Sequence, residues 1–269
     1  MEQPIAEPAG AEVLSIVVPA FNEEARVASS LERLIAFFEP RRAFEILVVD
    51  DGSRDGTAAI VSGLAERCPS VRLIQHVRNQ GKGAAIRTGM LEARGTMEVF
   101  SDADLPLPPD EIERMASLLE QGYDVIIASR GLGAEYIQAG RSPVRRVISR
   151  VFNRMVRRIF SLSLPDTQCG VKCFRREAGR AIFSRARIDS FAFDVEVLIL
   201  AKQLGCSIAQ VPVRVTDSGL STVRLTRHAW EVSRDLWRIR QNLRDDVYAI
   251  ESERPEVMQD VQVQSLSSP

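Results

Sequence analysis

Two aspartates one residue apart, Asp102 and Asp104, follow a short apolar run from Met97 to Phe100. Side chains alternate along an extended strand, so these carboxylates are expected to point the same way. Like charges at that spacing repel unless a cation lies between them, and a hard divalent ion with positions open for phosphate oxygens is the usual partner. We therefore predict a metal–diphosphate site here, with a solvated acidic turn closed by the following prolines as the alternative.

The segments around this pair alternate between β-rich runs and amphipathic stretches. Apolar runs, typical of strands buried on both faces, occupy 13–18, 44–49, 71–75 and 97–100, with a fifth at 125–128. Helical spacing of apolar residues lies between them, with stop signals such as Pro40. Strand and helix alternate four times with short loops, which predicts an α/β fold with a doubly wound, mostly parallel sheet of the Rossmann-like type.

Polar clusters follow each of the first four strands. These clusters are Asn22-Glu23, Asp50-Asp51, Lys82, and Asp102 with Asp104. The carboxyl ends of parallel strands share one edge, where such sheets bind ligands. Acids and one lysine converging there suit a ligand with ribose hydroxyls, a base with N–H donors and a metal-bound diphosphate, so a nucleotide is predicted.

Three other classes of nucleotide-binding or phosphate-binding site match the sequence less well. The Gly81-x-Gly83-x-x-Ile86 segment lacks the third glycine of a dinucleotide fingerprint and follows the third strand, not the first. Gly81-Lys82 lacks the earlier glycine and the following Ser or Thr of a phosphate loop. Asp50-Asp51 is compatible with a phosphoryl-receiver site, but such a domain would end near half this length.

Composition limits the remaining classes of protein. The chain has 269 residues with a net charge of −1, so no global field favours nucleic acid as a partner. Its four cysteines lack paired C-x-x-C spacing, so a zinc site is not expected. The first residues lack the apolar core of a secretory signal, and no run of about 18 apolar residues predicts a membrane span. A cytoplasmic location is therefore expected.

Several motifs, taken in order, resemble those of family 2 glycosyltransferases with the GT-A fold. They are Val17-Val18-Pro19-Ala20-Phe21-Asn22-Glu23-Glu24, Val48 to Thr57 with Asp50-Asp51-Gly52-Ser53, Asn79 to Gly89 with Gly81-Lys82-Gly83, and Asp102-Ala103-Asp104. Asp166-Thr167-Gln168-Cys169-Gly170-Val171-Lys172-Cys173-Phe174 and Phe191-Ala192-Phe193-Asp194-Val195-Glu196 resemble the dolichyl-phosphate glucosyltransferase branch. Over residues 12 to 243, the resemblance implies inverting transfer from a nucleotide-diphosphate sugar to a polyprenyl phosphate.

The resemblance also implies roles for single residues at the nucleoside. Pro19, Phe21 and Glu23 would lie against it, Asp51 would accept the base N–H, and Asp50 would lie beside Asp51.

At the diphosphate, the resemblance implies that Lys82 positions the nucleotide and that Asp102 lies by the ribose and the metal. Asp104 would hold the Mg²⁺ or Mn²⁺ ion that bridges the diphosphate. Two departures from the family pattern concern this region. Pro106 replaces a glutamine found in many relatives, and Leu220-Ser221-Thr222 replaces a late Gly-Ser-Lys motif.

Basic residues are concentrated in one part of the chain, and this concentration bears on which class of acceptor the protein uses. From Arg141 to Pro165 the chain has seven arginines and no acid, interleaved with apolar residues. As a helix this segment would have a basic and an apolar face, suited either to an anionic membrane surface or to ordinary packing on the sheet. A second amphipathic stretch, Thr226 to Val247, places Trp230 and Trp237 among arginines and leaves the same two alternatives open. Any membrane contact would be peripheral.

The chemistry of the acceptor determines which catalytic group is needed. A phosphate monoester has its second pKa near 6, so it is mostly dianionic at pH 7 and needs no strong base. It needs cations, and Arg130 after the fifth strand is the first candidate, with Arg141 and Arg145 behind it. If the acceptor is a hydroxyl, Asp194 is the best candidate base. The alternative for Asp194 is that it caps a helix from Val195 to Leu204.

These observations predict one GT-A domain over residues 12–225, preceded by a flexible tail at 1–11. An amphipathic helix at 226–250 and a disordered tail at 251–269 would follow. The predicted activity is hexosyl transfer from a nucleotide sugar to a polyprenyl phosphate on the cytoplasmic face of a membrane. A glycosyltransferase with a soluble or protein hydroxyl acceptor, and a non-catalytic nucleotide-sugar-binding protein, are the alternatives.

Overall fold

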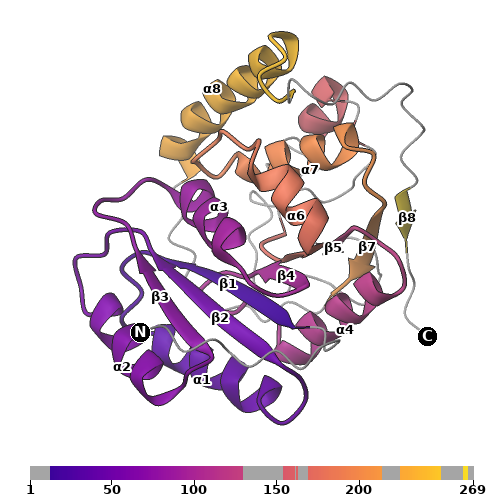
Figure 1. The fold of residues 1–269 in the computed structure, drawn as a ribbon. Helices are drawn as coiled ribbons and strands as arrows, with labels where there is room; N and C mark the ends of the chain where they lie inside the picture. Colours follow the sequence, from indigo (N-terminus) through magenta and orange to yellow (C-terminus); the bar gives the residue numbers. More distant parts are fainter. Residues whose placement is uncertain are drawn as a thin grey trace.

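Strands of this chain form one sheet in the order β3-β2-β1-β4-β6-β5-β7-β8 (Figure 1). The computed structural model describes residues 13–129, 154–160, 162, 169–213, 225–249 and 263–265. The first four strands are β1 (Leu14–Ala20), β2 (Phe44–Asp50), β3 (Val71–Gln75) and β4 (Met97–Phe100). All four run parallel, with β1 between β2 and β4.

The helices between these strands follow the predicted alternation. They are α1 (Val27–Phe38), α2 (Thr57–Arg67) and α3 (Lys82–Glu92). In α1, Val27, Leu31, Leu34 and Phe38 are spaced three or four residues apart and are all buried. Because each such side chain contributes about 1.5–3 kcal/mol on burial, this stripe fixes α1 on the sheet. Leu31→Ala would cost about 2–5 kcal/mol of stability.

The second half of the sheet contains one strand of opposite direction. β6 (Lys172–Arg175) lies antiparallel between β4 and β5 (Val125–Ser129). β7 (Ile208–Pro212) runs parallel to β5, and β8 (Val263–Ser265) pairs with β7. The sheet is therefore mostly parallel, as predicted. Because β6 is reversed, its first residue, Lys172, lies beside the carboxyl ends of β4 and β5.

The remaining helices are α4 (Pro109–Glu120), α6 (Arg176–Phe183), α7 (Phe193–Gln203) and α8 (Leu225–Arg244), and residues 154–160 are also helical. No helix among the described residues combines the length and apolar character needed to cross a bilayer.

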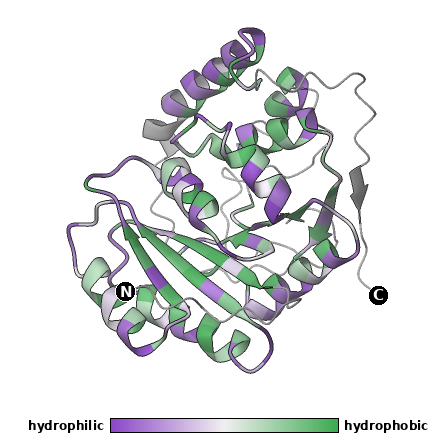
Figure 2. Ribbon diagram, viewed as in Figure 1, coloured by the Kyte–Doolittle hydropathy of each residue, from purple (hydrophilic) through white to green (hydrophobic). Residues whose placement is uncertain are grey.

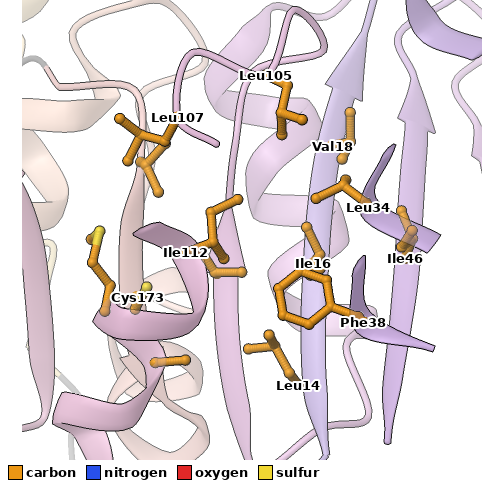
Figure 3. Close-up of a cluster of buried hydrophobic side chains, with 14 of the residues drawn as sticks. Leu14, Ile16, Val18, Leu34, Phe38, Ile46, Leu105, Leu107, Ile112 and Cys173 are labelled. Atoms are coloured by element: carbon orange, nitrogen blue, oxygen red, sulfur yellow. The ribbon is translucent and has the colours of Figure 1, made fainter. Parts of the chain in front are cut away.

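Helices cover both faces of the sheet (Figure 1). α1, α2 and α4 pack on one face, where Leu14, Ile16, Ile46 and Ile112 lie in a shared core (Figure 3). α3, α6 and α7 pack on the other face, with α8 outermost. The strands are apolar along most of their length while the outer helices carry the hydrophilic residues (Figure 2). Continuous burial on two faces explains why the strands appear in the sequence as unbroken apolar runs.

Candidate active site

The loops after β1 and β2 are hydrogen-bonded to each other. Asn22 N donates to Ser53 Oγ at 2.9 Å, and Arg54 N donates to Asn22 Oδ1 at 2.9 Å. Asn22 has a positive φ of 55°, a conformation that asparagine tolerates better than most residues. Glu23 N donates to Thr57 Oγ1 at 2.8 Å. The first two polar clusters therefore lie side by side at one edge of the sheet.

The candidate nucleoside residues differ in exposure. Phe21 exposes 42% of its surface just beyond β1, so its ring is accessible for stacking. Pro19 is half-buried within β1. Glu23 is half-buried, and its carboxylate pairs with Arg26, whose Nε lies 2.5 Å from Glu23 Oε2. Asp50 is buried and accepts a hydrogen bond from Ser53 N at 3.1 Å.

Asp51 holds the segment that leads into α3. Its Oδ1 lies 2.7 Å from His76 Nδ1 and accepts from Gln80 N at 2.9 Å, while Oδ2 accepts from Gly81 N at 2.8 Å. His76 Nε2 in turn lies 3.0 Å from Thr88 Oγ1. A carboxylate offers about four lone-pair positions, so these contacts leave room for about one more donor. Asp51, which is 3% exposed, thus organises the loop that leads into α3.

Lys82 begins α3 and reaches across to the loop after β4. Its Nζ lies 2.5 Å from Asp102 Oδ1, and the rings of Phe191 and Phe193 have their centroids 5.9 and 6.0 Å from Nζ. Burial lowers the pKa of Lys82, but the nearby carboxylates of Asp102, Asp194 and, more weakly, Asp104 outweigh it, so its pKa is raised. Lys82 is therefore a fixed positive charge at the predicted diphosphate position.

The loop after β4 carries both aspartates. Strand β4 ends at Phe100, and the chain then turns, with Leu105 N donating to Asp102 O at 2.9 Å, so the two aspartates do not lie on an extended strand as predicted. Ser101, Ala103 and Leu105 are buried, whereas Asp102 and Asp104 are half-buried, with Asp104 Oδ1 itself buried. Residues 169–170 close in on Asp102, because a Cβ at Gly170 would lie 2.5 Å from Asp102 Oδ2.

The donor set at this loop fits a small divalent cation. Asp102 and Asp104 provide hard carboxylate oxygens, the ligands that Mg²⁺ and Mn²⁺ prefer. The described residues contain no group of three acids, histidines or cysteines that could enclose a metal by themselves. Magnesium commonly keeps several waters and uses one or two carboxylates together with substrate phosphates, so two aspartates are sufficient protein ligands for it.

Asp194 is paired with a lysine that sequence reasoning overlooked. Lys172 is fully buried, and its Nζ donates to Asp194 Oδ1 and to Cys169 O, the latter at 3.0 Å. The same ammonium lies 5.3 Å from the ring centroid of Phe100. Burial raises the pKa of Asp194. The charge of Lys172 and, to a smaller extent, that of Lys82 oppose this rise. The cap of α7 is Ala192, with no side-chain cap bond, so the carboxylate of Asp194 serves an ion pair and not a helix cap.

Arg26, His76 and Lys172 were not among the predicted site residues. The pKa of Arg26 is raised, mainly by its hydrogen bond to Glu23. The nearby charge of Asp104 adds to this rise. Lys172 could have been identified from the sequence, because one lysine inside a run of buried strand residues needs an anionic partner. No signal in the sequence identified the partner of His76.

Three predicted cations, Arg130, Arg141 and Arg145, lie outside the described residues, as does most of the basic segment from 141 to 165. Strand β5 ends at Ser129, directly before Arg130, at the same edge as Asp102. In the helix 154–160, Val156 is buried, whereas Met155 and Ile159 expose 38% and 42% of their surface beside exposed arginines.

The mostly parallel sheet with helices on both faces defines an α/β protein of the GT-A type. The chain belongs to glycosyl transferase family 2, whose family model matches residues 15–183. It is therefore a glycosyltransferase by family.

Relatives and solved structures agree with this assignment. The chain is 34% identical to a dolichyl-phosphate beta-glucosyltransferase of Trichomonas vaginalis over 79% of this chain and 66% of the relative. It is 34% identical to the Drosophila melanogaster dolichyl-phosphate beta-glucosyltransferase over 84% and 74% of the two chains. It thus spans about two thirds to three quarters of these relatives' length. The fold is similar to Mycobacterium tuberculosis glucosyl-3-phosphoglycerate synthase bound to UDP, with a TM-score of 0.61, 22% identity and coverage of 91% and 83%.

Proposed function

We propose that this glycosyltransferase transfers a hexose from a nucleotide-diphosphate sugar to a polyprenyl phosphate. The observation that carries the proposal is the contact between Lys82 and Asp102, next to Asp104, at the carboxyl edge of the sheet. Relatives named dolichyl-phosphate beta-glucosyltransferase support the acceptor class. A further relative, the undecaprenyl-phosphate 4-deoxy-4-formamido-L-arabinose transferase of Pseudomonas aeruginosa, is 38% identical over 64% of this chain and 50% of the relative, and it supports the same class.

In this proposal the nucleoside lies over the loops after β1 and β2. The exposed ring of Phe21 stacks on it, Pro19 and Glu23 line its edge, and Asp51 accepts its base N–H through the remaining lone-pair position. Asp50, buried behind Asp51, holds Ser53 and so shapes the loop on which the ribose lies.

The diphosphate lies between Lys82 and the two aspartates of the β4 loop. Asp104, with Asp102, would hold Mg²⁺ or Mn²⁺, which when bound neutralises the negative charge of the diphosphate leaving group. Lys82 donates to a phosphate oxygen, and its raised pKa keeps it charged at neutral pH. Fixed charges in a partly water-excluded site stabilise the charge that develops on the leaving group without reorganisation.

The acceptor phosphate approaches the sugar from the side of β5 and β6. A phosphate monoester is already nucleophilic at pH 7, so the protein has to orient it and neutralise it. Arg130, which follows β5 at this edge, is proposed as the first phosphate contact, with Arg141 and Arg145 behind it. Asp194 has one oxygen held by Lys172 and is 6% exposed, so we assign it a role in placing charge beside Lys82.

We further propose peripheral contact with the cytoplasmic face of an anionic membrane. The exposed Met155 and Ile159 lie beside exposed arginines on the helix 154–160, and Trp237 exposes 62% of its surface on α8. Basic side chains combined with apolar and tryptophan residues are typical of helices that lie in a membrane interface. This surface would bring the chain to a lipid-linked acceptor.

One experiment tests donor and acceptor together. The purified protein is incubated with Mn²⁺, a panel of nucleotide sugars, and either a short polyprenyl phosphate or a soluble sugar alcohol. We expect one of the nucleotide sugars to give a glycolipid in which the sugar is linked to the polyprenyl phosphate. We expect no transfer to the sugar alcohol. Equal turnover on the hydroxyl acceptor would replace the lipid proposal with the alternative in which Asp194 acts as base. Nucleotide binding without transfer to any acceptor would leave a nucleotide-sugar-binding protein.

A further inference from the structure

Helix α8 has an outer face in solvent and an inner face against the protein, and it is the outermost helix on its side of the sheet (Figure 1). On the outer face, the side chains of Arg234 and Trp237 are about three-fifths exposed. On the inner face, Leu236 and Ile239 are buried in the core shared with α7, and Asp235 is 3% exposed among them. A buried carboxylate on an otherwise apolar face needs hydrogen-bond partners, and their location gives it a specific role.

Two hydrogen bonds join α8 and the turn after it to the region around the α6–α7 loop, residues 184–192. Ser190 Oγ donates to Asp235 Oδ2 at 2.5 Å, and it also accepts from Ala192 N at 3.1 Å. Just after α8, Tyr248 OH donates to Glu196 Oε1 at 2.6 Å. Tyr248 and Glu196 are 6% and 0% exposed. The contact between Tyr248 and Glu196 is therefore buried, where a hydrogen bond is costly to remove, and the contact between Ser190 and Asp235 is partly buried, on the side of Asp235.

Glu196 transmits the second contact into the same loop. Its carboxylate accepts from the backbone N–H of Arg187 at 3.0 Å and of Ile188 at 2.9 Å. Burial raises the pKa of Glu196, and the hydrogen bonds from Tyr248 and from these amides oppose that rise. The position of the α6–α7 loop thus depends on one carboxylate that Tyr248 holds from the side of α8.

The α6–α7 loop in turn packs on the first turn of α3. Gly83 N donates to Asp189 O at 2.8 Å, and Arg87 Nη2 lies 2.6 Å from Asp189 Oδ1. The approach is so close that a Cβ at Gly81 or Gly83 would come within 2.4 Å of a carbonyl oxygen of this loop. Lys82 lies between these two glycines. A shift of the loop must therefore move the residue that contacts Asp102.

We propose that Asp235 and Tyr248 are positioning residues of the donor site, acting through Ser190 and Glu196 on the α6–α7 loop and thereby on Lys82. In this arrangement the inner face of α8 sets the geometry of the diphosphate site. Asp235 uses Oδ2 for this contact, while its Oδ1 lies 3.3 Å from Arg234 Nη2 of the outer face. The inference rests on the proposed function in one respect, which is that Lys82 binds the donor diphosphate.

The test compares variants at the two contacts with an exposed control variant, all in the full chain. Asp235→Ala with Tyr248→Phe removes both contacts, and Asp235→Asn keeps an acceptor oxygen for Ser190. Asp245→Ala, an exposed aspartate just after α8, is the matched control. Ser190→Ala breaks the first contact from the loop side should Asp235→Ala reduce the yield of folded protein.

Two readouts are measured without acceptor or membrane. Hydrogen–deuterium exchange reports on residues 184–192 and on the first turn of α3. Calorimetry gives the affinity for whichever of UDP, GDP, ADP and CDP binds the wild type best with Mn²⁺. We expect faster exchange in both segments and about tenfold weaker nucleotide binding in the double variant, equivalent to ~1.4 kcal/mol. Asp235→Asn and Asp245→Ala should resemble the wild type in both.

Unchanged exchange in the double variant would overturn the inference. Faster exchange of the loop with unchanged nucleotide affinity would also overturn it, because the contacts would then be structural only. Should the wild type bind no nucleoside diphosphate, the proposed function fails, and faster exchange at the first turn of α3 still decides whether α8 positions Lys82.

Discussion

Lys82 Nζ lies 2.5 Å from Asp102 Oδ1, so the ammonium occupies one side of a carboxylate that is also a candidate metal ligand. In the proposed function, Lys82 and the metal ion would therefore compete for Asp102. A donor diphosphate would resolve this competition, because it would give Lys82 an alternative anionic partner while the metal takes the carboxylates.

Replacing Lys82 with Met should separate nucleotide binding from metal binding. Without the charge-assisted hydrogen bond to phosphate, worth about 1.5–3 kcal/mol, nucleotide affinity should fall roughly 10- to 100-fold. Mn²⁺ alone should bind more tightly, because Asp102 has lost its counter-ion. Calorimetry and Mn²⁺ electron paramagnetic resonance measure the two affinities. Arg33→Met, which removes an exposed charge from α1, is the control, and parallel changes in both variants would contradict the assignment.

Asp104→Asn should abolish sugar transfer while the protein stays folded. An amide carries no charge with which to hold a hard divalent ion beside Asp102. Transfer should also stop in excess chelator and return when Mg²⁺ or Mn²⁺ is added. Circular dichroism and the thermal midpoint check the fold. Full activity in chelator would refute a metal role for this loop.

The pair formed by Lys172 and Asp194 allows stability and function to be separated. Lys172→Met removes the hydrogen-bonded counter-ion of the buried Asp194 and leaves it with only the more distant charge of Lys82. The change should cost about 3–5 kcal/mol of unfolding free energy in urea titrations. The double variant Lys172→Met with Asp194→Asn should recover most of that loss. We expect sugar transfer to remain impaired in the double variant, because Lys82 has lost the nearby charge of Asp194. If the double variant transferred sugar at the wild-type rate, the pair would have only a structural role.

Glu98 should make the folded state less stable at alkaline pH. It lies on β4 with no exposed surface, and neither carboxylate oxygen has a hydrogen-bond partner among the described residues. Burial raises its pKa to about 8, with Arg176 and Arg180 opposing the rise and Glu45 and Glu177 adding to it. The folded state therefore binds a proton that the unfolded state has released. The stability that Glu98 contributes is fully present below pH ~4.5 and is lost as pH rises through ~8.

Urea titrations from pH 5 to pH 9 measure this dependence. The wild type should lose on the order of 4–5 kcal/mol through Glu98 across the whole window, and Glu98→Gln should remove that part of the slope. Glu66→Gln, an exposed change on α2, should keep the wild-type slope. An equally steep slope in Glu98→Gln would show that another group takes up the proton.

The sequence predicted most of the sheet, because its strands are buried on both faces and appear as unbroken apolar runs. β3 and β4 have the predicted bounds, β2 ends one residue later than predicted, and β1 begins one residue later and ends two residues later. β6 was not predicted, since Lys172–Arg175 is short and half polar, and its antiparallel pairing with β4 and β5 depends on contacts distant in sequence.

At the site, the polar residues that follow strands could be predicted, whereas their partners could not. Asp51 was identified from its position after β2, but its contact with His76 depends on how the chain after β3 turns back. Likewise, Asp194 was identified from its motif, but its pairing with Lys172 depends on the position of β6.

The reversed direction of β6 also has a consequence for how members of such a family can diverge. The chain leaves the sheet after Ser129 and re-enters it at Lys172, and both points lie at the edge that carries Asp102. The stretch between them can therefore be exchanged between homologues without cutting a strand, provided that core residues such as Val156 and Val171 are matched. In the proposed function this stretch carries the acceptor contacts. We then expect a hybrid to keep the nucleotide specificity of the chain that receives the segment and to take the acceptor specificity of the chain that supplies it.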